Sequence, residues 1–262
     1  LTRFPKPDFG FAAHVGPFPA GLVAMKSGPS MASTDAYTIT FHGRGGHGSA
    51  PAATIDPIPM AVRFVTDVQT VVSREKDPAA FGVITVGAFQ AGSASNIIPA
   101  QAELKVNLRA HNDEVREKLN EGTKRTAIAA AQMGAAPSPT ITYLQGTGVL
   151  MNDPSMTKAA YDVLKPIIGP QAHFQDERET PVSGSEDYSE FVQAGIPSVF
   201  FWIGGYEVAK LAALKERGEP VPTNHSPFFA PSAEPSVRAA VSAITLSIIG
   251  GVRPTSTAAT QP

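Results

Sequence analysis

Cysteine is absent from the 262 residues of this sequence. Its absence excludes a disulfide scaffold, a thiolate zinc site and a cysteine nucleophile within these residues. Any metal ion would therefore be held by His, Asp or Glu. A marked excess of one charge is also missing, because 21 Lys and Arg face 23 Asp and Glu. Since phosphate binding needs a basic excess, we expect no nucleic-acid partner.

Long apolar runs are lacking as well. No run reaches the roughly 18 residues that a membrane span needs, so we expect no membrane partner. The first ten residues, LTRFPKPDFG, lack the apolar region of roughly 7–15 residues found in signal peptides. We accordingly expect a cytoplasmic protein. Hydrophobic residues make up 42% of the sequence, which is enough to build a sizeable core.

The middle of the sequence has the most regular pattern. Residues 36–42 alternate between apolar and polar, which predicts a strand. Asp56-Pro57 is typical of a helix start and predicts an amphipathic helix over about 57–75. The apolar residues expected to face inward on this helix are Ile58, Ala61, Val62, Val65, Val68 and Val72. Further strands are expected at 82–89, 101–109 and about 140–145, and a second helix at 113–132.

The resulting order is β-α-β-β-α-β, the ferredoxin-like pattern. We expect both helices to cover one face of this sheet, leaving the other to solvent or a partner. Its exposed edges would be natural pairing surfaces.

The flanking sequences predict an α/β domain that this α+β domain interrupts. A short strand over 9–15 precedes the insert and ends near His14; we expect no other strand there. A helix follows Asp153, and a short helix is expected from Ser185 to Val192. The remaining expected elements are a buried strand at 197–203 and helices at 207–217 and about 232–249. The tail from Arg253 to the end has the composition of a disordered segment.

Three of the six histidines have suggestive surroundings. His14 is expected at a strand end, where α/β sheets bind ligands, and His225 lies in the loop TNHSPFF. Either is a candidate metal ligand or an ordinary hydrogen-bonded histidine. His47 lies in the glycine-rich loop GRGGHGSAP, which would let a ligand approach closely or simply form a flexible hairpin.

Three other residues have two interpretations each. Glu186, in GSEDYSEF, would cap a helix or serve a site. Arg109 would form a surface ion pair or clamp a carboxylate through two hydrogen bonds. Asn96, in SASNIIP, would be a turn residue or a donor to a substrate oxygen.

Taken together, these motifs resemble the M20 metallopeptidase family, and within it the amidohydrolases that act on hippurate, N-acyl amino acids and auxin–amino-acid conjugates. The segments that carry the resemblance are FGFAAHVGPFPAG, GRGGHGSAP, SASNIIPA, NLR, GSEDYSEF and NHSPFF, in this order. The resemblance implies a zinc-peptidase-like α/β catalytic domain with an inserted ferredoxin-like lid that mediates homodimerisation. We expect the catalytic domain at 1–33 and 147–252, the lid at 34–146 and the tail at 253–262.

The resemblance also implies roles for the candidate residues. His14 and His225 would be metal ligands in a site for two divalent ions, Zn²⁺ or Mn²⁺. His47 would be catalytic and would stabilise the oxyanion in the neighbouring subunit's active site. Asn96 and Arg109 would bind the carboxylate end of an N-acyl amino acid, with Glu186 at the pocket edge.

One part of the family pattern is not found in this sequence. The family's early cysteine-and-histidine metal motif and its Glu-Glu pair, which includes the general base, would lie upstream of Leu1. We therefore expect a C-terminal portion of an amidohydrolase that is inactive by itself. The alternatives are a non-catalytic dimerisation or binding module and an M20 exopeptidase acting on dipeptides.

Overall fold

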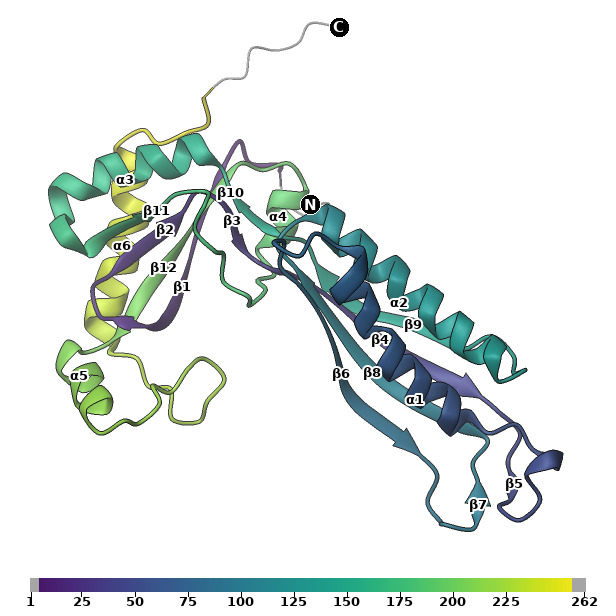
Figure 1. Cartoon of the computed structure of the whole chain (residues 1–262). Helices are drawn as coiled ribbons and strands as arrows, with labels where there is room; N and C mark the ends of the chain where they lie inside the picture. Colours follow the sequence, from purple (N-terminus) through teal and green to yellow (C-terminus); the bar gives the residue numbers. More distant parts are fainter. Residues whose placement is uncertain (1–4, 256–262) are drawn as a thin grey trace, which may run out of the picture. The chain divides into compact units, whose positions relative to one another are not determined.

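The computed structural model describes residues 5–255, which divide into two compact units (Figure 1). The first unit contains the described residues up to Ser30, Leu150–Pro181 and those from Tyr188 onward. The second contains Met31–Val149 and the short segment Val182–Asp187. We expected this segment in the α/β domain. It groups with the second unit because the Ala32 amide donates to two of its carbonyls, at 3.0 and 2.8 Å.

The second unit is built on a four-stranded antiparallel sheet in the order β6-β8-β4-β9. Two helices, α1 and α2, lie on one face of it (Figure 1). The elements are β4 (Ser33–His42), α1 (Pro57–Asp67), β6 (Gly82–Ala91), β8 (Gln101–Ala110), α2 (Asp113–Met133) and β9 (Thr140–Thr147). The predicted β-α-β-β-α-β order is confirmed. Two short pieces, β5 (Gly46–His47) and β7 (Ile97–Ile98), pair with each other and were not predicted.

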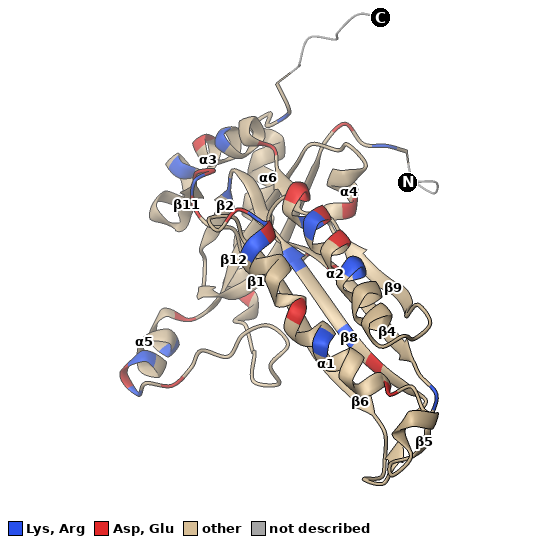
Figure 2. Cartoon of the chain, turned by 45° about the vertical axis from the view of Figure 1, so that its right-hand side comes forward, with Lys and Arg blue, Asp and Glu red and all other residues tan. Residues whose placement is uncertain are grey.

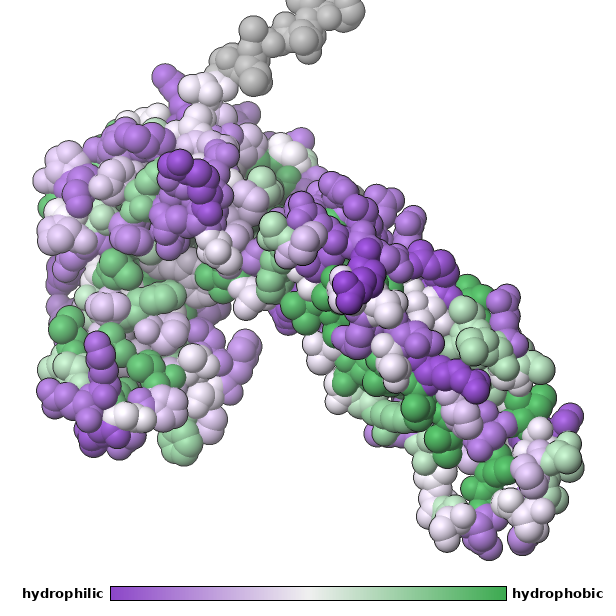
Figure 3. Space-filling view, in the orientation of Figure 1, coloured by the Kyte–Doolittle hydropathy of each residue, from purple (hydrophilic) through white to green (hydrophobic). Residues whose placement is uncertain are grey.

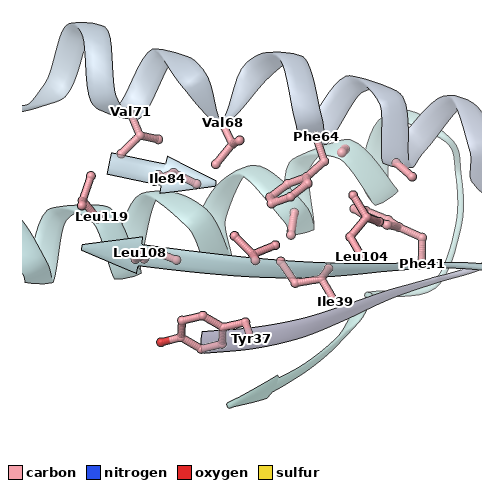
Figure 4. Packing of buried hydrophobic residues seen from close by; sticks show 14 of the residues in the cluster. Tyr37, Ile39, Phe41, Phe64, Val68, Val71, Ile84, Leu104, Leu108 and Leu119 are labelled. Atoms are coloured by element: carbon pink, nitrogen blue, oxygen red, sulfur yellow. The ribbon is translucent and has the colours of Figure 1, made fainter. Parts of the chain in front are cut away.

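The core of the second unit lies between this sheet and the helices (Figure 4). Tyr37, Ile39 and Phe41 are buried on one side of β4, as their alternation predicts. The inward face of α1 differs in part from the prediction, because Val62 is 49% exposed and Phe64 is fully buried. The buried residues of α1 and the turns after it are Pro57, Met60, Ala61, Phe64, Val68 and Val71.

The helix expected to run unbroken to residue 75 changes its hydrogen bonding after Asp67. The Thr70 hydroxyl donates to the Asp67 carbonyl at 2.6 Å, in competition with a backbone donor. The next turn, η2 (Val71–Glu75), is π-helical and still buries Val71. The apolar face continues through this change of hydrogen bonding, since Val68 and Val71 are both buried.

The first unit has a four-stranded sheet in the order β1-β12-β2-β11. Its strands are β1 (Gly10–Pro19), β2 (Val23–Lys26), β11 (Ala172–Gln175) and β12 (Ser198–Tyr206). β1 runs parallel to β12, whereas β2 runs antiparallel to β12. A separate pair joins β3 (Gly28–Met31) to β10 (Leu150–Asn152). The expectation of one strand before the insert was therefore wrong, because β2 and β3 were too short to give a pattern.

The helices of the first unit follow the predictions with one exception. They are α3 (Pro154–Ile168), α4 (Ser189–Gln193), α5 (Val208–Glu216) and α6 (Ala233–Ile249), with a short turn η3 (Gly169–Gln171). α4 starts later than the helix expected from Ser185, so Glu186 does not lie in a first helical turn. α3 and α6 pack on the sheet through an apolar cluster that includes Phe201 and Leu164.

β12 lies inside the sheet and is buried at every residue except Trp202, which is half-buried. β1, in contrast, has a partner strand on one side only within the described residues.

The surface carries both charges and apolar groups. Lys and Arg residues are interspersed with Asp and Glu residues along α2, whereas α1 carries only Arg63 and Asp67 (Figure 2). Apolar side chains also reach the surface of the second unit (Figure 3), among them Phe89, Met133 and Leu144. None of the helices in residues 5–255 is long and apolar enough to cross a membrane. Of the tail expected from Arg253, residues 256–262 lie outside the described part.

Candidate functional site

His14 lies within β1 rather than at its end, because the strand continues to Pro19. It is paired in register with Trp202 of β12, and the two rings are 5.4 Å apart. Its Nδ1 lies 2.8 Å from the carbonyl oxygen of Val15. Because a carbonyl only accepts, Nδ1 donates to it, and in a neutral ring Nε2 then keeps its lone pair. This is the arrangement that metal-binding histidines usually have.

The loop of His225 meets β1 at the same carbonyl. The Asn224 side chain donates to the Val15 oxygen at 2.9 Å. His225 itself is exposed and has a φ of 69°, a left-handed conformation that few non-glycine residues adopt. The structure therefore brings the chain segments of the two candidate metal ligands together within the first unit. Asn224, which makes this connection, was not predicted.

His14 and His225 by themselves do not form a metal centre. Among residues 5–255 there is no group of three or more His, Cys, Asp or Glu side chains that could hold an ion. A protein metal site normally uses three or four such ligands. The two imidazoles thus fit a partial site at most, and the described residues do not fit a two-metal centre.

His47 and Asn96 lie together in the second unit. The β5–β7 ladder pairs His47 with Ile97, and the Gly48 amide donates to the Asn96 carbonyl at 2.8 Å. Both side chains are exposed.

The glycines of this loop serve the fold. A Cβ at Gly43 would lie 2.1 Å from the Ile55 carbonyl oxygen, and one at Gly45 would lie 2.8 Å from that of Ile98. They allow backbone to pack on backbone, which sets the position of His47.

Arg109 contacts the segment that contains Glu186. Its Nη1 donates to the Ser183 carbonyl and to the Ser185 hydroxyl, each at 3.3 Å. Its Nε donates to Oδ1 of Asn107 at 3.1 Å. Arginine has five N–H groups, and the two on Nη2 have no hydrogen-bond partner among the described residues. No ion pair of Arg109 is found among residues 5–255, and its Nη2 could donate to an anionic group.

Asn107 was overlooked because it is one of several polar residues on the outer side of β8. Its side-chain amide donates to Thr34 Oγ1 at 2.9 Å and lies 3.4 Å from the Asp35 carbonyl. The amide is therefore held in place, which leaves Oδ1 facing Arg109. Its position two residues before Arg109, on the same strand face, is the signal that would have identified it.

Comparison with known proteins gives the class to which this chain belongs. Residues 34–131 match the family described as the peptidase dimerisation domain. Hippurate hydrolase of Campylobacter jejuni is 35% identical over 187 residues, which is 71% of this chain and 48% of that protein. N-acetylcysteine deacetylase of Bacillus subtilis is 33% identical over 197 residues, 74% of this chain and 50% of that protein.

Another relative has a peptidase name. Thermostable carboxypeptidase 2 of Saccharolobus solfataricus is 31% identical over 198 residues, 75% of this chain and 49% of that protein. The chain thus spans about half the length of these curated relatives.

Solved structures share the fold. A crystal structure from methicillin-resistant Staphylococcus aureus superposes with a TM-score of 0.77 at 24% identity, covering 94% of this chain and 60% of that chain. The YXEP protein of Bacillus subtilis, described as a dinuclear metal-binding peptidase from the M20 family, superposes with a TM-score of 0.65 at 24% identity; 93% of this chain and 58% of that chain are covered. The chain belongs to the M20 peptidase family, in its amidohydrolase branch. Its fold is the M20-like α/β fold with a dimerisation domain.

Proposed function

We propose that this chain is the C-terminal portion of an enzyme that hydrolyses the amide bond of N-acyl amino acids. The observation that carries the proposal is Arg109, which is held by Asn107 and the Ser183–Ser185 segment and keeps its Nη2 donors for a ligand. The free carboxylate of an N-acyl amino acid is the group such an arginine would bind. The names of the hippurate hydrolase and N-acetylcysteine deacetylase relatives support this substrate class.

The site residues take the following roles in this proposal. Arg109 binds the carboxylate end of the substrate, and Glu186 lies at the edge of the pocket. Asn96 lies beside His47, at the end of β8 opposite to Arg109, so it would reach the same carboxylate from a second subunit, as is proposed for His47. His47 donates a hydrogen bond to the oxyanion that forms when the amide carbonyl is attacked. His14 and His225 are two of the ligands for divalent ions, Zn²⁺ or Mn²⁺, of which a complete site would hold two.

The described residues hold no group of three or more metal-ligating side chains, and the Glu-Glu pair of the family is not found in the sequence. We therefore propose that the 262-residue chain is inactive by itself. The test is to load it with Zn²⁺ or Mn²⁺ and measure release of glycine from hippurate. No release is expected, and measurable hydrolysis would contradict the proposed inactivity.

The enzyme proposal has its own test in the coding sequence upstream of Leu1. A Gly-Cys-Gly-His-type segment and a Glu-Glu pair there would support it, whereas a nearby stop codon would favour a non-catalytic module. If the upstream segment exists, assays of the longer protein on hippurate and on dipeptides distinguish an amidohydrolase from an exopeptidase. The carboxypeptidase relative is the observation that keeps the exopeptidase in consideration.

We also propose that the protein is a homodimer through its second unit. The match of residues 34–131 to a dimerisation domain supports this, as do the exposed apolar side chains of that unit. Light scattering coupled to size exclusion should give a mass near twice the 27.4 kDa of one chain. A monomer at high protein concentration would argue against the dimer.

A further inference from the structure

The backbone around His47 is fixed on both sides of the residue. Gly46 and His47 pair with Ile98 and Ile97 in the β5–β7 ladder. On the other side, the Ala50 amide donates to the His47 carbonyl at 2.9 Å, which closes a turn. With the main chain held in this way, the orientation of the imidazole depends on what its ring atoms contact.

Among the described residues, both polar contacts of the ring come from Ser49. The Ser49 peptide N–H donates to Nδ1 of His47 at 3.1 Å, and the Ser49 hydroxyl oxygen lies 2.7 Å from the same atom. A peptide N–H can only donate, so Nδ1 must be the unprotonated nitrogen. A neutral imidazole of this kind carries its single proton on Nε2. The ring is exposed, so this N–H is available to a ligand.

We propose that Ser49 is a positioning residue that holds His47 in the Nε2–H tautomer, which makes the ring a hydrogen-bond donor rather than a base. The nature of the acceptor, the oxyanion of the reacting amide, rests on the proposed function. The tautomer does not, because it follows from the contacts of Ser49 alone.

His14 provides an internal contrast. Its Nδ1 faces the Val15 carbonyl and therefore carries the proton, so its Nε2 is a lone-pair donor. Neighbouring backbone groups thus favour opposite tautomers of the two histidines. His14 presents a lone pair to a cation, and His47 presents an N–H group to an anion. Residues one or two positions further along the chain, Val15 and Ser49, determine the difference.

The test is to determine both tautomers by long-range ¹H–¹⁵N correlation on the ¹⁵N-labelled 262-residue protein. The spectrum is recorded at about pH 8, above the ordinary imidazole pKa of about 6.5. For His47, the ¹⁵N chemical shift of Nδ1 should be that of an unprotonated nitrogen and the shift of Nε2 that of a protonated nitrogen. For His14, the two shifts should be reversed. His42 is the matched control, since its Nε2 contacts only the Thr140 hydroxyl, which can donate or accept. Protonated Nδ1 on His47, or averaged positions for its two nitrogens, would overturn the proposal.

Substitution of Ser49 tests the residue itself. Ser49→Ala removes the 2.7 Å contact but keeps the peptide N–H, so the minor Nδ1–H population of His47 should rise about three- to tenfold. Ser49→Thr keeps the hydroxyl and should restore the wild-type ring spectrum. An unchanged backbone amide spectrum shows that the variant is folded. If Ser49→Ala leaves the His47 tautomer and ring mobility unchanged, Ser49 does not position the ring. This outcome is independent of whether any form of the protein hydrolyses hippurate.

Discussion

Replacement of Arg116 by alanine is expected to destabilise the second unit strongly. The Asp35 side chain is only 4% exposed, and the guanidinium of Arg116 binds both of its oxygens at 2.8 Å. Asn120 donates to the same carboxylate at 3.0 Å and Tyr143 at 3.2 Å. The carboxylate also holds the pKa of Arg116 above its ordinary value, chiefly through this hydrogen bond.

The expected loss of unfolding free energy follows from the unpaired Asp35 carboxylate that Arg116→Ala would create. Removing one partner of a buried ion pair costs about 3–5 kcal/mol, because the other charge stays buried and unpaired. Two neutral donors remain on Asp35, and Arg116 is itself 26% exposed, so the lower end of this range, about 3 kcal/mol, is expected. The matched control is Arg125→Ala, which removes the exposed pair with Glu75 and should cost less than about 1 kcal/mol.

The assay must report on the correct unit. The single tryptophan, Trp202, lies in the first unit, so its fluorescence would not follow the loss. Urea unfolding followed by far-ultraviolet circular dichroism, with amide hydrogen exchange of β4 and β8, gives the stability of the second unit. If Arg116→Ala lowers this stability no more than Arg125→Ala does, the buried pair does not hold α2 on the sheet.

Three further predictions concern the same unit. Burial, and next the charge of Asp35, raises the pKa of Tyr37 to about 12, above the ordinary value of about 10. The stability that the neutral phenol contributes is therefore fully present below pH 10 and is lost as the pH rises towards 12. Tyr37→Phe should reduce this loss of stability, as measured by urea unfolding at several pH values. Asn107→Ala frees Nε of Arg109, so an active form of the protein should show KM for hippurate raised about three- to tenfold, with the uncharged hippuramide unaffected. In a longer, active form of the protein, His47→Ala should lower kcat without loss of metal, and mixing it with a His14→Ala variant should recover activity if His47 acts across a dimer. No recovery would contradict that arrangement.

Long, regular elements of the fold could be predicted because their patterns are local. The alternation of β8 and the Asn112 cap of α2 each give a clear signal within a few residues. β2 and β3 have four residues each, too few for a period, and pairing with distant strands decides their conformation. The Val182–Asp187 segment was misplaced for the same reason, since its hydrogen bonds go to Ala32, far away in the sequence.

The sequence supplies candidate site residues, whose roles stay predictions, but it does not supply their contacts. The motifs contain His14, His47, Asn96 and Arg109, and these residue types in this order indicate the candidates. Their supporting residues are ordinary polar residues with no pattern of their own. Ser49 and Asn107 can be identified only from their contacts with His47 and Arg109. The distances of these contacts are set by backbone pairing.

The one-sided pairing of β1 within the described residues would allow a second mode of self-association, different from the proposed dimer. Within the described residues, one edge of the ten residues of β1, GFAAHVGPFP, has no partner strand and lies next to apolar side chains. A bare strand edge of this kind recruits further strands one after another, without a symmetry that closes the assembly. A dimer through the second unit, in contrast, stops at two copies. Slow growth of large particles in a stored sample would therefore originate at β1, whereas a fixed doubling of mass would not.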